Sequence, residues 1–140
     1  MTFPAKVFID TNIVLDLLTR REPFFADAEK LFSLSDKGCF ELYISADSFT
    51  TIAYFLNKYH SKQDTVKHLI QFKTLVTILP VNEKVIDLAL VSKAADFEDA
   101  VQIAVAETNG MNCIVTRNIK DFSQTILAVF DPKLFLKSFN

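Results

Sequence analysis

The sequence predicts an α/β protein, a three-layer α/β/α sandwich with a central, mostly parallel sheet. Short apolar runs that suit buried strands alternate along the chain with longer stretches in which apolar residues recur at helical spacing. Strands that alternate with helices are typical of βαβ crossovers, which place parallel strands between two helical layers. The chain has 140 residues, half of them hydrophobic, so we expect a single domain over residues 1–140.

The first element is a strand at residues 6–9, where three consecutive apolar residues follow Lys6. It leads into a helix to about residue 20, because Val14, Leu17 and Leu18 share one helical face. Comparable signals predict the later elements in this order: helix 24–38 ending at Gly38, strand 39–46, helix 48–59 capped by Ser45 or Asp47, helix 62–75, strand 76–81, helix 82–92 capped by Asn82, helix 96–110 ending at Gly110, strand 112–116, a loop and short helix 117–124, an edge strand near 127–130 and a closing helix 132–139.

Composition excludes several classes of protein. The 15 Lys and Arg residues are balanced by 17 Asp and Glu residues, and a net charge of −2 argues against a broad cationic surface for duplex DNA. A local basic groove remains compatible with this total, and five cations lie near the loops that we expect to flank a cleft: Arg20, Arg21, Lys58, Arg117 and Lys120. Only two glycines occur, both at predicted helix ends, so a glycine-rich phosphate loop is not expected.

Cysteine usage and the N-terminus indicate the compartment. Cys39 and Cys113 open apolar strand-like runs and form no CxxC pair, which predicts buried thiols and suits a reducing cytosol. The first apolar stretch is short and is interrupted by Asp10 and Asp16, so we expect neither a signal segment nor a membrane span. We therefore expect a cytoplasmic protein with no membrane partner.

Polar residues follow two of the predicted strands and begin one helix. Asp10 ends the first strand, Asp96 and Asp99 begin a helix, and Asn118 and Asp121 follow the strand at 112–116. Ligands of parallel sheets bind outside the carboxyl ends of the strands, so these residues converge if the first and fourth strands are neighbours. Clustered carboxylates repel one another, and oxygen ligands without His or Cys favour Mg²⁺ or Mn²⁺ over Zn²⁺.

Each of these acids also has a purely structural explanation. Asp96 suits a helix N-cap, Asp99 suits the first turn of a helix, and Asp121 suits a solvated loop. Asp16 is expected at the surface or as a capping residue, without a chemical role. Asp10 is different, because an acid that ends an apolar strand and faces a sheet crevice is harder to explain structurally.

Three stretches, "FIDTNIVLDLL", "DFEDAVQIAVA" and "CIVTRNIKDF", occur in this order and at these distances. Together they resemble the PIN domain family and, within it, toxin nucleases of the VapC kind. The resemblance implies a three-layer fold and Mg²⁺- or Mn²⁺-dependent cleavage of RNA, with an antitoxin protein as a further partner. We also expect a homodimer. The site residues that it implies are the catalytic acids Asp10, Asp99 and Asp121, the further metal ligands Asp96 and Asn118, and the orienting residues Thr11, Asn12 and Thr116. For substrate binding we single out Arg117 and Lys120, which lie in the last of these stretches.

One position departs from the family pattern. The family usually has a Glu on the helix after the second strand, and Thr51 occupies that position here. Asp47 lies one turn earlier and is a candidate substitute. With fewer carboxylates to hold a cation, a catalytically impaired RNA-binding or protein-interaction module is the main alternative to an active nuclease. A haloacid dehalogenase-like phosphatase is less favoured, because it needs a second Asp where this chain has Asn12.

Overall fold

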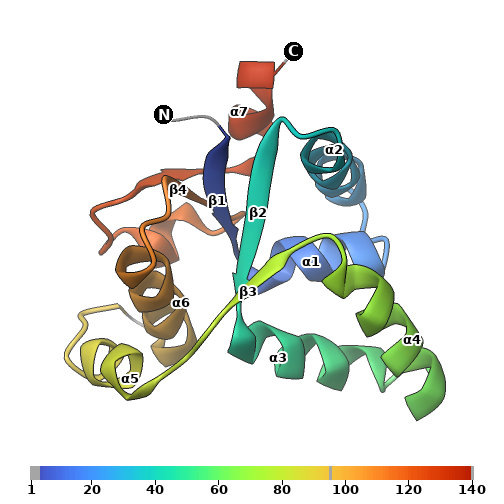
Figure 1. The fold of residues 1–140 in the computed structure, drawn as a ribbon, viewed down its shortest axis with the longest axis horizontal. Helices are drawn as coiled ribbons and strands as arrows, with labels where there is room; N and C mark the ends of the chain where they lie inside the picture. Colours follow the sequence, from blue (N-terminus) through green and yellow to red (C-terminus); the bar gives the residue numbers. More distant parts are fainter. Residues whose placement is uncertain (1–3, 95, 140) are drawn as a thin grey trace.

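The computed structural model describes residues 4–94 and 96–139, and they form a sheet of five parallel strands between two helical layers (Figure 1). The strand order is β3-β2-β1-β4-β5. The strands are β1 (Ala5–Ile9), β2 (Phe40–Ser45), β3 (Thr77–Leu79), β4 (Cys113–Val115) and β5 (Ala128–Phe130). The predicted fold class, with its parallel sheet between helices, is confirmed.

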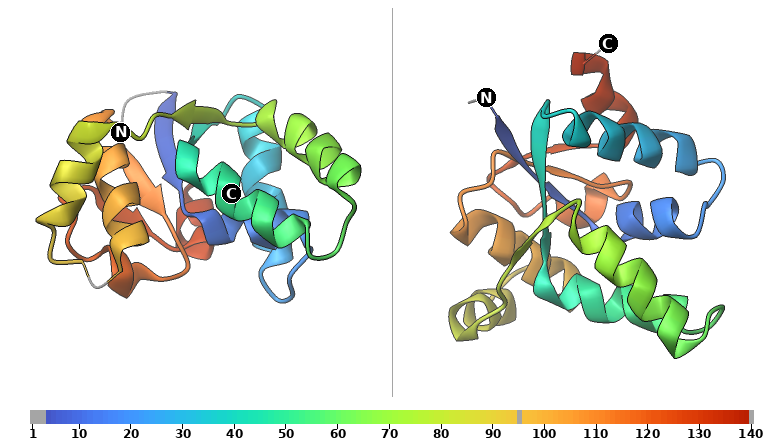
Figure 2. Two further views of the ribbon diagram at one scale, coloured as in Figure 1. Left: turned by 90° about the horizontal axis from the view of Figure 1, so that it is seen from below. Right: turned by 45° about the vertical axis from the view of Figure 1, so that its right-hand side comes forward.

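The helices divide between the two faces of the sheet, as the views in Figure 2 show. Five of them pack on one face: α1 (Thr11–Leu18), α2 (Phe25–Asp36), α3 (Ala46–Leu56), α4 (Lys62–Lys73) and α7 (Pro132–Leu136). On the other face lie α5 (Glu83–Leu90), α6 (Phe97–Thr108) and the 3₁₀ turn η1 (Ile119–Phe122), while a second 3₁₀ turn, η2 (Lys137–Phe139), follows α7.

The central strand β1 is buried on both of its faces. Val7 and Ile9 belong to the core beneath α1–α4, whereas Phe8 belongs to the core beneath α5 and α6. This division follows from the period of two along a strand, which sends alternate side chains to opposite faces. A continuous apolar run is therefore what a central parallel strand needs, and residues 7–9 of β1 provide it, with the exposed Lys6 before them.

The first and fourth strands are neighbours, as the predicted site requires. Ile9 of β1 is in register with Val115 of β4, and the Asp10 N–H donates to the Val115 carbonyl at 3.1 Å. On the other side of β4, the Thr116 N–H donates to the Phe130 carbonyl at 3.0 Å. These contacts bring the carboxyl ends of β1, β4 and β5 to one edge of the sheet.

Local signals in the sequence account for several element ends. Gly38 and Gly110 have φ of 86° and 68°, the left-handed conformation that favours glycine after a helix. Asn82 caps α5 by accepting from the Val85 N–H at 3.0 Å. Ser45 occupies the N-cap position of α3, but its hydroxyl donates to the carboxylate of Asp47.

The thiols and the membrane expectation can also be compared with the structure. Cys113 is buried, and burial raises its pKa to about 12, whereas Cys39 is partly exposed. The expectation of a buried thiol thus holds for Cys113 and only in part for Cys39. Within residues 4–94 and 96–139, no helix has both the length and the apolar character to span a bilayer.

Candidate active site

Asp10 lies at the N-terminal end of α1, where β1 ends, and is only 3% exposed. The Thr116 hydroxyl donates to Asp10 Oδ2 at 2.9 Å, which links the ends of β1 and β4 through their side chains. Burial raises the pKa of Asp10, and hydrogen bonds from Thr116, Gln102 and the backbone N–H groups of Asn12 and Thr11 oppose that rise. The carboxylate is therefore held in place by several donors, although it lies away from bulk water.

Asp96 and Asp99 lie at the start of α6, as predicted. Asp96 is the N-cap and accepts from the Glu98 N–H at 2.8 Å, so its structural explanation as a cap is correct. Asp99 is half-buried, and its pKa is raised to about 7, first by burial and then by the negative charges of Asp96, Asp10, Asp121 and Glu98. The acids of β1, α6 and η1 are thus close enough to disfavour ionisation of Asp99.

The loop after β4 carries the remaining predicted residues. The Asn118 N–H donates to the Thr116 hydroxyl at 3.0 Å, and the Asp121 N–H donates to the Asn118 carbonyl at 3.0 Å. Asn118, Lys120 and Asp121 are exposed and help to line an open cavity of about 400 Å³. The loop therefore presents polar groups to solvent while Thr116 anchors it to Asp10.

The start of α3 is tied to the start of α1. The hydroxyls of Thr11 and Ser48 are 2.7 Å apart, and both side chains are buried. Thr51 lies one turn beyond Ser48, is half-buried and donates to the Asp47 carbonyl at 3.4 Å. The helix that would carry the usual Glu therefore lies against the segment that follows Asp10.

Glu98 and Gln102 belong to this group of residues but were not singled out in the sequence. Burial raises the pKa of Glu98, and so do the charges of Asp47, Asp96 and Asp10. Gln102 is 1% exposed, and its Oε1 atom finds no hydrogen-bond partner among the described residues. Spacing is the signal that would have indicated Gln102, because it follows Asp99 by three positions and shares its helical face.

The acids match a hard divalent cation in charge and in ligand type. Asp10, Asp96, Asp99, Asn118 and Asp121 offer only oxygen ligands of the kind that Mg²⁺ and Mn²⁺ prefer. The mutual rise in pKa at Asp99 is the repulsion that a cation relieves. As the side chains lie, no three Asp, Glu, His or Cys residues of the described chain are grouped closely enough to hold a metal. The types of ligand fit the ion, but the side chains do not converge on one point.

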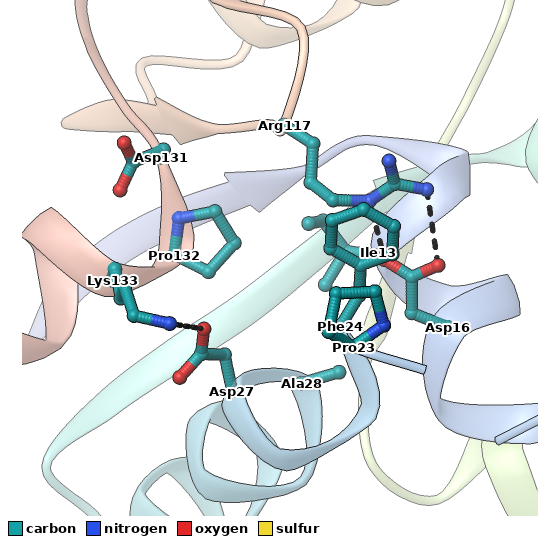
Figure 3. Close-up of a pocket in the computed structure, with 10 residues that line it drawn as sticks. All are labelled: Ile13, Asp16, Pro23, Phe24, Asp27, Ala28, Arg117, Asp131, Pro132 and Lys133. Atoms are coloured by element: carbon teal, nitrogen blue, oxygen red, sulfur yellow. Dashed lines mark hydrogen bonds and ion pairs between the residues drawn. The ribbon is translucent and has the colours of Figure 1, made fainter. Parts of the chain in front are cut away.

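Asp16 corrects the expectation of a surface or capping acid, because its side chain is only 1% exposed. Arg117 Nε donates to Asp16 Oδ2 at 2.7 Å and the Arg117 Nη2 atom donates to Asp16 Oδ1 at 3.1 Å (Figure 3). Arg21 lies further away, with Nη1 at 3.8 Å from Asp16 Oδ1. Helical spacing brought this acid to the inner face of α1, where two arginines make its burial tolerable.

The same ion pair borders a cavity of about 260 Å³ between α1, α2 and α7 (Figure 3). Phe24 lies over the guanidinium of Arg117, with 3.7 Å from Cζ to the ring centroid. On the opposite wall, Lys133 Nζ pairs with Asp27 Oδ2 at 3.3 Å. Asp10 and Asp99 are not among the lining residues, so this cavity is distinct from the acidic group.

Two other predicted cations lie against aromatic rings. Arg20 lies over Phe25 at 5.7 Å, and Lys58 lies 4.7 Å from the centroid of Tyr54. Arg20 and Arg21 help to line a cavity of about 480 Å³ between the ends of α1 and α3. The expectation that these cations flank an RNA groove stays a prediction.

Comparisons with known proteins address the family and the fold. Among solved structures, a toxin-antitoxin complex from Klebsiella pneumoniae matches with a TM-score of 0.67 and 23% identity over 90% of this chain and 97% of that chain. DNA-bound VapBC from Salmonella typhimurium gives a TM-score of 0.69 and 16% identity over 91% and 98%. A VapC toxin of Mycobacterium tuberculosis, described as cleaving the sarcin-ricin loop, gives 0.61 and 19% over 77% and 86%.

These identities show a shared fold. No curated protein sequence matches the chain significantly. The sequence model described as the PIN domain matches residues 6–120, which include the first two stretches of the predicted site and the third as far as Lys120, so Asp121 lies just beyond the match. With four-fifths of its length covered by that match, the chain belongs to the PIN domain family.

Proposed function

We propose that this protein is a metal-dependent ribonuclease that cleaves RNA phosphodiester bonds. The observation that carries the proposal is the gathering of acids from β1, α6 and η1, which raises the pKa of Asp99 to about 7. Such a concentration of like charge at the open edge of a parallel sheet destabilises the fold unless a bound proton or cation neutralises it. Membership of the PIN domain family is consistent with this use.

The proposed metal ligands are Asp10, Asp96, Asp99, Asn118 and Asp121, with Mg²⁺ or Mn²⁺ as the cofactor. When bound, such an ion supplies an activated water and stabilises the charge that develops on the leaving oxygen. Asp10, Asp99 and Asp121 are the proposed catalytic acids.

Other residues of the chain hold these acids in place. The Thr116 hydroxyl donates to Asp10 Oδ2 and so fixes one oxygen of that carboxylate. The backbone N–H groups of Thr11 and Asn12 lower the pKa of the same carboxyl and so favour its ionised form. Lys120 is exposed on the loop after β4 and is a proposed contact for RNA phosphate. Arg117, the other substrate contact predicted from the sequence, has its guanidinium bound to Asp16.

We further propose that the protein is the toxin of a toxin-antitoxin pair and acts as a homodimer. The relatives from Klebsiella pneumoniae and Salmonella typhimurium were solved as toxin-antitoxin complexes, and they span the chain almost completely. Binding of a co-expressed antitoxin that suppresses cleavage would support this part of the proposal.

Cleavage of RNA in Mn²⁺, Mg²⁺ and EDTA tests the proposed activity. We expect cleavage that needs the cation and that is lost in Asp10→Asn, because the central carboxylate is removed. Asp87→Asn is the matched control, since Asp87 is an exposed acid on α5. Full activity in a folded Asp10→Asn protein would contradict the proposed mechanism.

The second candidate function is an RNA-binding or protein-interaction module with an impaired site, and Thr51 is the observation that favours it. Thr51→Glu should tighten Mn²⁺ binding in calorimetry, because α3 lies against the start of α1 and one more carboxylate faces the acids. Thr50→Glu is the matched control, since Thr50 is the exposed neighbour on the same helix. Tighter binding without RNA cleavage would favour the impaired module, whereas unchanged affinity in a folded protein would show that Thr51 does not face the site.

A further inference from the structure

We infer that Arg117 is a positioning residue: its ion pair with buried Asp16 holds the loop that places Thr116 and Asn118 beside Asp10. The consequence for RNA cleavage rests on the proposed nuclease function, whereas the placement of the loop does not. Arg117 thereby receives a role other than the substrate contact predicted from the sequence.

The guanidinium of Arg117 makes two kinds of contact. Its N–H groups bind Asp16, and its planar face packs against Phe24. Two donors reach both carboxylate oxygens, at 2.7 and 3.1 Å, and the ring of Phe24 covers the guanidinium at 3.7 Å. Arg117 is 20% exposed and Asp16 1% exposed. A bidentate, charge-assisted pair removed from water has one preferred geometry, so it restrains the backbone that carries it.

Two successive residues of this loop therefore bind two acids, one just before α1 and one within it. Thr116 donates to Asp10 at the start of the helix, and Arg117 donates to Asp16 further along it. The next residue, Asn118, donates its N–H back to the Thr116 hydroxyl. With both side chains held, the chain at Asn118 has little freedom to rotate away from Asp10.

Arg21 provides a comparison within the same ion-pair group. It approaches the same carboxylate, at 3.8 Å, but it belongs to the segment between α1 and α2. Loss of Arg117 leaves Asp16 with this second cation, yet Arg21 is not part of the loop after β4. The two arginines thus share a charge partner and differ in what they hold.

Amide hydrogen exchange of residues 116–121, measured by mass spectrometry or NMR without added metal, tests the inference directly. The N–H groups of Thr116, Asn118 and Asp121 are all hydrogen-bonded and report opening of the loop. We expect exchange about tenfold faster in Arg117→Met than in the natural sequence, because local opening becomes easier once the ion pair is lost. Arg117→Lys should recover part of the protection, since lysine keeps the positive charge but cannot form the paired hydrogen bonds of the guanidinium.

Two controls separate positioning from general stability. Arg21→Met removes the other cation from Asp16 and should leave exchange of residues 116–121 unchanged. Phe72→Leu weakens the core at α4, far from this loop in the chain, and should lower the melting temperature without selective opening of residues 116–121.

Kinetics with RNA give a second readout. A positioning role predicts that kcat falls, by up to about 10²-fold, while KM stays near its natural value, because the acids are misplaced and RNA binding is not lost. A substrate contact predicts the reverse pattern, a raised KM in a protein whose loop exchanges normally.

Unchanged exchange of residues 116–121 in a folded Arg117→Met protein would overturn the inference, as would equal opening in Arg21→Met. If Arg117→Met does not fold, Arg117→Lys decides by the same exchange comparison. Absence of RNA cleavage by the natural sequence would contradict the proposed function. The hydrogen-exchange comparison would then still test whether Arg117 holds the loop.

Discussion

Asp16 and Asp99 are both removed in part from water, yet their surroundings are opposite. Asp16 is almost fully buried and lies between two arginines, one of which forms two hydrogen bonds with it. Asp99 is half-buried, and the charges that act on it are carboxylates, so its pKa rises to about 7. Asp16 thus has cations as its neighbours, whereas Asp99 has carboxylates as its neighbours and is destabilised as an ion.

The difference gives a physical basis for distinguishing an acid held in an ion pair from an acid that would gain stability by binding a cation. A buried carboxylate that is already paired with cations has little capacity to bind a further cation as a ligand. A carboxylate held among other carboxylates binds a proton or a cation more tightly than usual, which is a property that chemistry can use. Predictions that remove one partner from each group test this contrast.

The largest expected effect on stability comes from breaking the paired group. Arg117→Met should lower the free energy of unfolding by about 3 kcal/mol, because it leaves the buried Asp16 carboxylate with only the more distant Arg21. Urea unfolding followed by circular dichroism measures this change. A loss below about 0.5 kcal/mol would mean that Arg21 replaces Arg117 as the charge partner.

The opposite sign is expected in the unpaired group. Asp99→Asn should raise the free energy of unfolding in EDTA by about 1 kcal/mol at mildly alkaline pH, since one of several repelling charges is removed. The half-exposed position of Asp99 keeps this gain modest, because solvent screens the repulsion. Loss of stability in Asp99→Asn would show that the carboxylate has a stabilising partner after all.

The pH dependence of stability should carry the signature of Asp99. Its pKa is 3.8 in the unfolded chain and about 7 in the folded chain, so the folded protein binds the proton more tightly between these values. The stability that this proton contributes is present below about pH 4 and is lost as the pH rises to about 7.

The difference in unfolding free energy between Asp99→Asn and the natural sequence, both in EDTA, isolates this contribution from other titrating groups. It should grow from about pH 4 to about pH 7 and then level off. A difference that does not change across this window would contradict the raised pKa of Asp99.

The smallest effect is expected at the exposed ion pair across the cavity of Figure 3. Lys133 is 80% exposed and Asp27 31% exposed, so Lys133→Met should change the free energy of unfolding by less than about 0.5 kcal/mol. Replacement of a cation by Met is thus expected to have a large effect at Arg117 and little effect at Lys133. Comparable losses at both positions would remove burial as the explanation of the contrast.

Much of the fold could be predicted because its signals are local. The apolar run of β1, the left-handed glycines at 38 and 110 and the cap at Asn82 each depend on a few neighbouring residues. The order of strands and helices then restricts the sheet to parallel crossovers. Ser45, one of the two caps predicted for α3, occupies the N-cap position, but its side chain binds Asp47 and caps no backbone N–H of the described helix.

The acids of the candidate site could be predicted for a related reason. Asp10 interrupts an apolar strand-to-helix run, and Asp96 and Asp99 begin a helix, so their positions at one edge follow from the parallel topology. Their roles in metal binding and catalysis stay predictions. Glu98 was missed because an acid in the first turn of a helix has an ordinary explanation until Asp47 and Asp10 are seen to act on it.

By itself, the sequence determined the elements, their order and the edge of the sheet at which Asp10 lies. Only the tertiary structure decided which carboxylates have cations beside them. Asp16 and Arg117 are 101 positions apart, and their hydrogen bonds exist because β4 lies next to β1 and returns the chain to α1. The state of a charge depends on its neighbours in space and on its removal from water, and neither quantity is written in the residues that adjoin it along the chain.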